Sequence, residues 1–211
     1  LAGVTVVVGA VYLRWSREPV VVGRVDLDVR ATVRRLFAVP ELRLLTVAYC
    51  MFMTTIQGVL GFLPTLLGTE VGLSPELASS TFAVLFAAGL VIKPASGRLS
   101  DRFPRPAVGG TALLVGTVGI ASVIVADGVV GASVALVGVA VGTKGFGPAM
   151  QAYLMDHFPA ESMGGDFGAL RTAYMGVGAL GPVYVGAVAE RVGYGPAFAG
   201  LAALFGVAGL L

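Results

Sequence analysis

The chain has 211 residues, of which 56% are hydrophobic and 12% are charged. Soluble domains carry about 25% charged residues, so this composition excludes an ordinary soluble protein and predicts one that crosses a membrane several times. The net charge of +2 is too small to indicate a nucleic-acid partner, and the single cysteine, Cys50, can form neither an intrachain disulfide nor a metal site by itself.

Residues 1–13 form the first apolar run. Arg14, Trp15 and Arg17 follow it, as expected where a membrane helix meets the interface. The run has no basic segment before it and no small-residue cleavage site after it, so we interpret it as the end of a transmembrane helix and not as a signal peptide. Both ends of the chain lie within apolar runs, and we expect it to be part of a longer protein.

Residues 14–41 form the one long polar segment. Val29, Val33 and Leu36 recur there at helical spacing among several arginines, which predicts an amphipathic helix lying on a surface. Two interpretations stay open: the helix contacts anionic lipid headgroups, or the segment is a solvated linker with local helix.

Six apolar runs follow between residues 42 and 211. In lipid only a helix or a closed barrel satisfies every backbone N–H and C=O, and about 20 residues cross the hydrocarbon core as a helix. Ser74 and Pro75 predict an N-cap and first position for the second helix. We therefore predict an all-α polytopic membrane protein, a six-transmembrane-helix half bundle, with spans at 42–67, 76–96, 107–126, 129–155, 167–189 and from 196 onward.

Basic residues gather on one side of the predicted membrane. The segments 14–41, 97–106 and 156–166, with Arg171 close to the third, contain most of them, whereas the opposite loops contain only Arg191. By the positive-inside rule, these three segments are predicted to be cytoplasmic loops of a multi-pass protein of the cell membrane.

The loop between the second and third spans reads Gly97-Arg98-Leu99-Ser100-Asp101-Arg102-Phe103-Pro104-Arg105. It resembles the signature loop of the major facilitator superfamily, in which an aspartate follows glycine by four residues and basic residues come next. Gly97, Asp101, Arg102 and Arg105 match that pattern. Phe103-Pro104 departs from it, because the family usually has an aromatic or apolar residue followed by glycine there.

This resemblance implies the C-terminal half of a secondary transporter, with residues 1–13 as the end of the family's sixth helix. It implies alternating access for a small-molecule solute, with or without a coupling proton or ion, together with an N-terminal half and the lipid bilayer. Asp101 is then expected to meet a helix of the N-terminal half and to latch the cytoplasmic gate in one state. The simpler alternative is a positive-inside turn with no further role.

Lys144 is the clearest candidate for a binding site. A charge near mid-span costs about 2.5 to 3.5 kcal/mol on insertion scales, so it indicates function by default. At about 100° per residue, Lys144, Pro148 and Gln151 share a face predicted to line water, whereas Gly138, Gly142, Gly145 and Ala149 share a packing face. Lys144 is expected to bind an anionic or polar substrate or to couple to a proton; the alternative is a structural pair with a carboxylate elsewhere.

The first complete span carries a weaker candidate set. Cys50, Thr54, Gln57 and Gly61 share one helical face, in a span that the resemblance makes cavity-lining. Gln57 can bind substrate or can join two helices by a hydrogen bond, and the sequence leaves both roles open.

The run from Gly176 to Gly181 matches a dinucleotide-binding fingerprint letter for letter. We interpret the match as accidental, because it lies within a predicted span and Pro182 follows at once. Gly178, Gly181, Pro182 and Gly186 instead predict a closely packed helix that can kink.

The sequence implies no catalytic chemistry, no cofactor and no metal site. One histidine and scattered acidic residues do not favour an integral membrane enzyme, which stays the alternative class together with a channel subunit.

Overall fold

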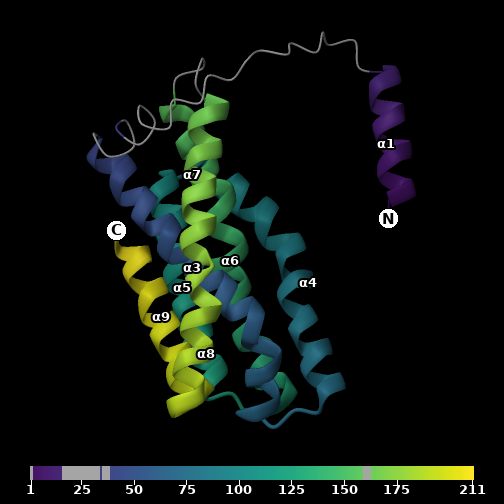
Figure 1. Cartoon of the computed structure of the whole chain (residues 1–211), viewed down its shortest axis with the longest axis vertical. Coiled ribbons are helices and arrows are strands. Elements are labelled where there is room, and N and C mark those ends of the chain that lie inside the picture. Colours follow the sequence, from purple (N-terminus) through teal and green to yellow (C-terminus); the bar gives the residue numbers. More distant parts are fainter. Residues whose placement is uncertain (1, 16–33, 35–38, 159–162) are drawn as a thin grey trace.

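The computed structural model describes residues 2–15, 34, 39–158 and 163–211, and within these ranges its secondary structure is helical (Figure 1). The helices are α1 (Ala2–Trp15), α3 (Pro40–Thr69), α4 (Pro75–Ser100), α5 (Arg105–Ile124), α6 (Gly128–His157), α7 (Met163–Gly178), α8 (Leu180–Val192) and α9 (Tyr194–Leu210). Helices α3 to α9 form one bundle, and α1 stands apart from it.

The predicted all-helical half bundle is confirmed. Five segments are long and apolar enough to cross a membrane, with α7 and α8 together forming the fifth, and α9 is a shorter apolar helix. The predicted N-cap is also present, because the Leu77 N–H donates to Ser74 Oγ at 3.4 Å and Pro75 occupies the first turn of α4. The amphipathic helix predicted within 14–41 lies largely outside the described residues.

The span predicted at residues 167–189 is present as one segment, Met163–Val192, in which a single residue, Ala179, separates two helices. Proline has no N–H, so Pro182 cannot donate to the carbonyl of Gly178, four residues earlier, and its ring crowds that carbonyl. Helix α7 ends at Gly178 and α8 begins at Leu180. The kink that glycine and proline predicted is therefore a break between two short helices.

The helices alternate in direction along the bundle (Figure 1). The start of α3, the α4–α5 turn and the end of α6 lie at one end, which we call the arginine end because Arg98, Arg102 and Arg105 lie there. The α3–α4 and α5–α6 turns lie at the opposite end, with Gly193, whose φ of 93° suits glycine, between α8 and α9.

Glycine brings α5 and α6 into backbone contact. A Cβ atom added at Gly142 would lie 2.7 Å from the Cα of Gly116, and one added at Gly138 would lie 3.0 Å from the Cα of Gly119. In lipid, where apolar burial drives helix association little, small residues let two backbones approach and gain van der Waals contact. The predicted packing face of this helix is thus occupied by α5, and we call this contact the glycine seam.

Aromatic rings join the remaining helices at the centre of the bundle. Tyr49 stacks on Tyr174 with ring centroids 5.0 Å apart, and Phe52 lies 4.5 Å from Phe146 and 5.9 Å from Phe205. Each of these five side chains is 2% exposed or less. The cluster connects α3 with α6, α7 and α9 and fixes the position of α3, the helix that reaches the break between α7 and α8.

The glycine seam yields a paired stability test. We expect Gly142→Ala to lower the free energy of unfolding by about 1–3 kcal/mol, because its methyl group would overlap the Phe205 ring and the Gly116 backbone. Gly147→Ala, in the same helix, meets no atom within 4 Å in the described structure and should change stability by less than about 0.5 kcal/mol. Thermal unfolding of the full-length protein in detergent measures both, and equal melting temperatures for the two variants would contradict the seam.

Candidate functional site

Lys144 lies between α6 and α4. A Cβ atom added at Gly89 of α4 would lie 3.1 Å from Lys144 Cγ and 3.6 Å from its Cε, so the glycine provides the space through which the lysine side chain runs. Lys144 is half-buried near the middle of the 30-residue helix α6. Its methylene groups pack on α4, and only the ammonium end extends beyond that contact.

The ammonium group of Lys144 lies over an aromatic ring. Its Nζ is 4.9 Å from the ring centroid of Phe86, whose side chain is 49% exposed. Such a cation–π contact contributes about 0.5–1 kcal/mol at an exposed site and about 2 kcal/mol when water is excluded. Within the described part of the chain no carboxylate forms an ion pair with Lys144, so its charge is balanced there by the ring alone.

The neighbours of Lys144 on α6 extend this polar region. Gln151 is exposed two turns further along the helix, and Pro148, between them, has no N–H to donate to the Lys144 carbonyl. The adjacent Thr143 hydroxyl is buried and lacks a hydrogen-bond partner among the described residues. The expected polar face therefore carries one cation and one exposed amide, which suits a polar ligand, whereas the Thr143 hydroxyl is buried beside it.

Thr54 and Gln57 contact the end of α7. The Thr54 hydroxyl lies 2.9 Å from the Cys50 carbonyl of its own helix and 3.3 Å from the Val177 carbonyl, and its one proton serves both. Gln57 Nε2 donates to the Met175 carbonyl at 3.3 Å. The Met175 carbonyl also accepts from the Ala179 N–H at 3.2 Å, whereas Pro182 leaves the Gly178 carbonyl without its helical donor. These two side chains of α3 therefore supply donors where α7 ends.

The glycines of the break differ in their surroundings. A Cβ at Gly181 would overlap the backbone of Thr54 and Gly58, and one at Gly178 would overlap the Gln57 amide and lie 3.0 Å from Met53 Cβ. At Gly186 the nearest atom, from a Phe62 ring, is 3.9 Å away, which is an ordinary contact. Gly178, Gly181 and Pro182 thus shape the contact with α3, and Gly186 does not restrict it.

The loop with the family-like pattern has one ion pair within the described structure. The guanidinium of Arg105, at the start of α5, pairs with the carboxylate of Asp156 near the end of α6. Asp101 and Arg102 are exposed, and Asp101 caps the end of α4 with its backbone N–H donating to the Gly97 carbonyl at 3.2 Å. A Cβ at Gly97 would meet no described atom within 4 Å, so no described helix uses this glycine for a close approach.

The candidates fall into separate groups. Lys144 contacts α4, whereas Thr54 and Gln57 contact α7, and the loop residues lie at the arginine end. Sequence reasoning missed Phe86 and Asp156. The spacing of Phe86, Gly89 and Lys93, which places them on one face of a helix, was the signal available for Phe86; nothing in the spacing singles out Asp156 as the partner of Arg105.

The hydrogen bonds to α7 give a test of Gln57. We expect Gln57→Leu to lower the free energy of unfolding by about 0.6 kcal/mol, the average for interhelical hydrogen bonds in a membrane, and by at most about 1.7 kcal/mol, because the Met175 carbonyl loses one of its donors. Thermal unfolding in detergent measures the loss. Gln151→Leu is the matched control, since Gln151 is exposed, and a similar loss in both variants would show that the Gln57 bond contributes nothing particular.

Comparison with known proteins adds one match. The family model described as Major Facilitator Superfamily matches residues 45–211, which includes α4 to α9 and nearly all of α3. A search of curated proteins finds no match.

Proposed function

Because the chain belongs to the Major Facilitator Superfamily of transporters, we propose that it is the C-terminal half of a secondary transporter. It moves a small solute across the cell membrane by alternating access, rocking against an N-terminal half around a site near the middle of the bilayer. The six-helix arrangement of α3 to α9, in which α7 and α8 form one broken span, supports this proposal.

The observation that carries the substrate proposal is the position of Lys144. An intramembrane ammonium group is costly, and the described residues balance it with the Phe86 ring and no carboxylate. A carboxylate or phosphate on the solute supplies the missing negative charge, so we assign Lys144 to an anionic solute, with Gln151 as a polar neighbour. A carboxylate of the N-terminal half, or proton coupling at Lys144, is the competing explanation.

Thr54 and Gln57 are assigned to positioning the break between α7 and α8 in the fifth span. Their donors are already engaged by carbonyls of α7, which supports a positioning role for both side chains over direct contact with the solute. The break lies in the span that was expected to be able to kink. It gives this span a point at which α7 and α8 can change their mutual angle during the transport cycle.

The arginine end is assigned to the cytoplasm. Gly97 has free space beside it, and Asp101 and Arg102 are exposed, so all three can receive a helix of the N-terminal half. Arg105 is engaged by Asp156 within this half, and we assign it to holding α5 against α6 instead of to the gate. The segments 14–41, 97–106 and 156–166 are then cytoplasmic by the positive-inside rule.

Substitution of Lys144 tests the substrate proposal. The full-length transporter is screened by thermal unfolding against small carboxylates and phosphates, and an anion that stabilises it is used for uptake into proteoliposomes. We expect Lys144→Ala to lower the affinity for that anion at least about tenfold, which removes about 1.4 kcal/mol of its stabilisation at saturation, and to lower uptake to a similar extent. Undiminished uptake by Lys144→Ala would overturn the assignment.

Two further variants separate charge from structure. Lys144→Arg keeps the cation and should retain part of the anion-dependent stabilisation. Lys93→Ala removes the other lysine of the chain, which is exposed and lies closer to the arginine end, and it should affect uptake much less. If Lys144→Ala and Lys144→Arg lose stability without any anion present and Lys93→Ala does not, Lys144 is a structural residue.

A further inference from the structure

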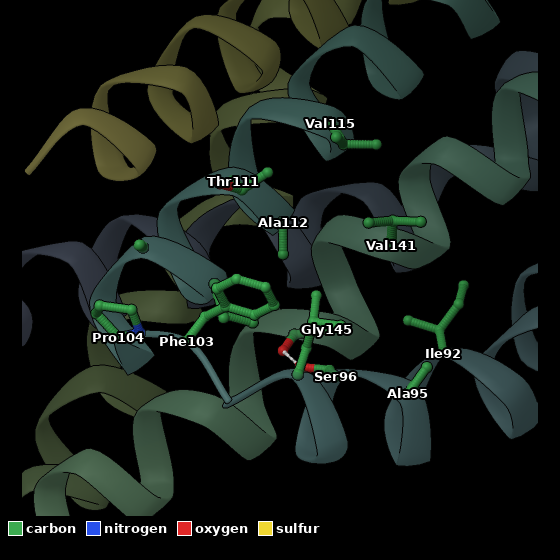
Figure 2. A pocket seen from close by; sticks show the side chains of 13 residues that line it. Ile92, Ala95, Ser96, Phe103, Pro104, Thr111, Ala112, Val115, Val141 and Gly145 are labelled. Carbon is green, nitrogen blue, oxygen red and sulfur yellow. Dashed lines mark hydrogen bonds between the residues drawn. The ribbon is translucent and has the colours of Figure 1, made fainter. Parts of the chain in front are cut away.

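A deep apolar cavity opens between α4 and α5 at the arginine end. Its volume is about 490 Å³, within the range of about 300–1,000 Å³ typical of ligand pockets. Ile92 and Ala95 lie on the α4 side and Thr111 and Val115 on the α5 side (Figure 2), and Leu99 of α4 and Ala107 of α5 also line it. We call this cavity the α4–α5 slot.

The slot exists because α4 and α5 both pack on α6 but scarcely on each other. Val141 and Gly145 of α6 form its floor, and Phe103 and Pro104 of the α4–α5 turn line it at the arginine end. From Ala107 to Val115 the α5 wall rises about 12 Å at 1.5 Å per residue. The slot is thus an elongated space that runs from the turn into the membrane.

Water is a poor occupant of the slot. A buried water needs two to four polar partners, and the lining offers few. The Ser96 hydroxyl, which lies in the wall, already donates to the Gly145 carbonyl at 2.5 Å, and Thr111 is the other hydroxyl (Figure 2). The remaining lining is aliphatic, aromatic or backbone, and leaving it without partner atoms forfeits van der Waals contact.

The slot also differs from the proposed solute site. Lys144 lies against Gly89 and over Phe86, and neither of these α4 residues lines the slot. The contact of α6 with Ser96 and Ile92 lies between the two regions, because a Cβ at Gly145 would be 3.7 Å from Ile92 Cγ2 and 4.0 Å from Ser96 Cβ. A molecule in the slot therefore does not occupy the place assigned to the solute.

An exposed arginine precedes each of two lining residues at the arginine end of the slot. Leu99 and Phe103 line it, and their chain neighbours Arg98 and Arg102 are exposed and form no ion pair with any described carboxylate. Asp101 offsets part of this charge. Basic residues beside a gap between transmembrane helices on the cytoplasmic side recruit anionic lipid headgroups.

We propose that the α4–α5 slot holds one acyl chain of an anionic phospholipid, whose phosphate is bound by Arg98 and Arg102. The chain fills the aliphatic space that water cannot fill, and the two guanidinium groups select lipids that carry net negative charge. Lipid tails are as apolar as the slot, so the fit of the chain sets its position and the arginines provide the preference. The bound lipid fills the space between the walls of α4 and α5, which make few direct contacts with each other.

Native mass spectrometry of the full-length protein tests this proposal. The protein in detergent is titrated with phosphatidylglycerol and, separately, with phosphatidylcholine that has identical acyl chains. We expect the first phosphatidylglycerol to bind more tightly than phosphatidylcholine. In Arg98→Gln/Arg102→Gln its affinity should fall by about fivefold per arginine, from the usual contribution of a basic residue near an anionic surface.

A second variant fills the slot itself. Ala95 lines the slot and is exposed, so Ala95→Phe should displace the chain and reduce tight binding of both lipids, with Ala107→Phe on the opposite wall as a replacement if the first variant folds poorly. The matched controls are Ala121→Phe, exposed on α5 outside the slot, and Arg191→Gln, exposed at the opposite end of the bundle. Both controls should bind lipid as the wild type does.

Three results would overturn the proposal. Equal affinity for the two lipids in the wild type would remove the headgroup preference. Sensitivity to the arginine substitutions without any effect of the filling variants would indicate headgroup binding on the surface alone. Binding of the uptake-supporting anion in the slot, at an affinity that added phospholipid does not change, would make the slot part of the solute path. Because lipid binding is measured without transport, it can fail or succeed independently of the proposed function.

Discussion

The backbone contact between α5 and α6 sets the position of everything else in the bundle. In a bilayer the hydrophobic effect contributes little between helices, so the absence of side chains at Gly116, Gly119, Gly138 and Gly142 supplies the close fit. Once that face of α6 is committed to α5, its other faces have fixed neighbours. One carries Lys144 against α4, and one carries Val141 and Gly145, the floor of the slot.

A second constraint is the need to satisfy backbone carbonyls in lipid. Pro182 deprives Gly178 of a helical donor, α7 ends there, and Thr54 and Gln57 donate to the carbonyls of Val177 and Met175. Polar side chains of α3 therefore form hydrogen bonds with the end of α7. This is why two residues that resemble solute ligands in the sequence are better understood as positioning residues.

The positions of the charged side chains follow from the cost of burying a charge in lipid. At the arginine end, side chains reach the interface, one of them pairs with Asp156, and the others stay exposed for lipid or for a partner half. Lys144 lies deeper, beside the Phe86 ring and without an ion pair to a described carboxylate. The free-energy cost of its ammonium group in the membrane must therefore be offset by a negative charge outside the described residues. The two regions therefore suit different ligands, a lipid headgroup at one and a solute at the other.

The sequence determined the all-helical membrane class, the number of spans, the N-cap at Ser74 and the packing face of α6, because hydropathy, capping and helical periodicity are local properties. It also identified Lys144, since a charge within an apolar run is visible without coordinates. Only the tertiary structure placed Lys144 over Phe86, paired Arg105 with Asp156, engaged Gln57 at the end of α7 and opened the slot between α4 and α5. Each of these depends on which helices become neighbours and at what separation, and no spacing within a single helix encodes that.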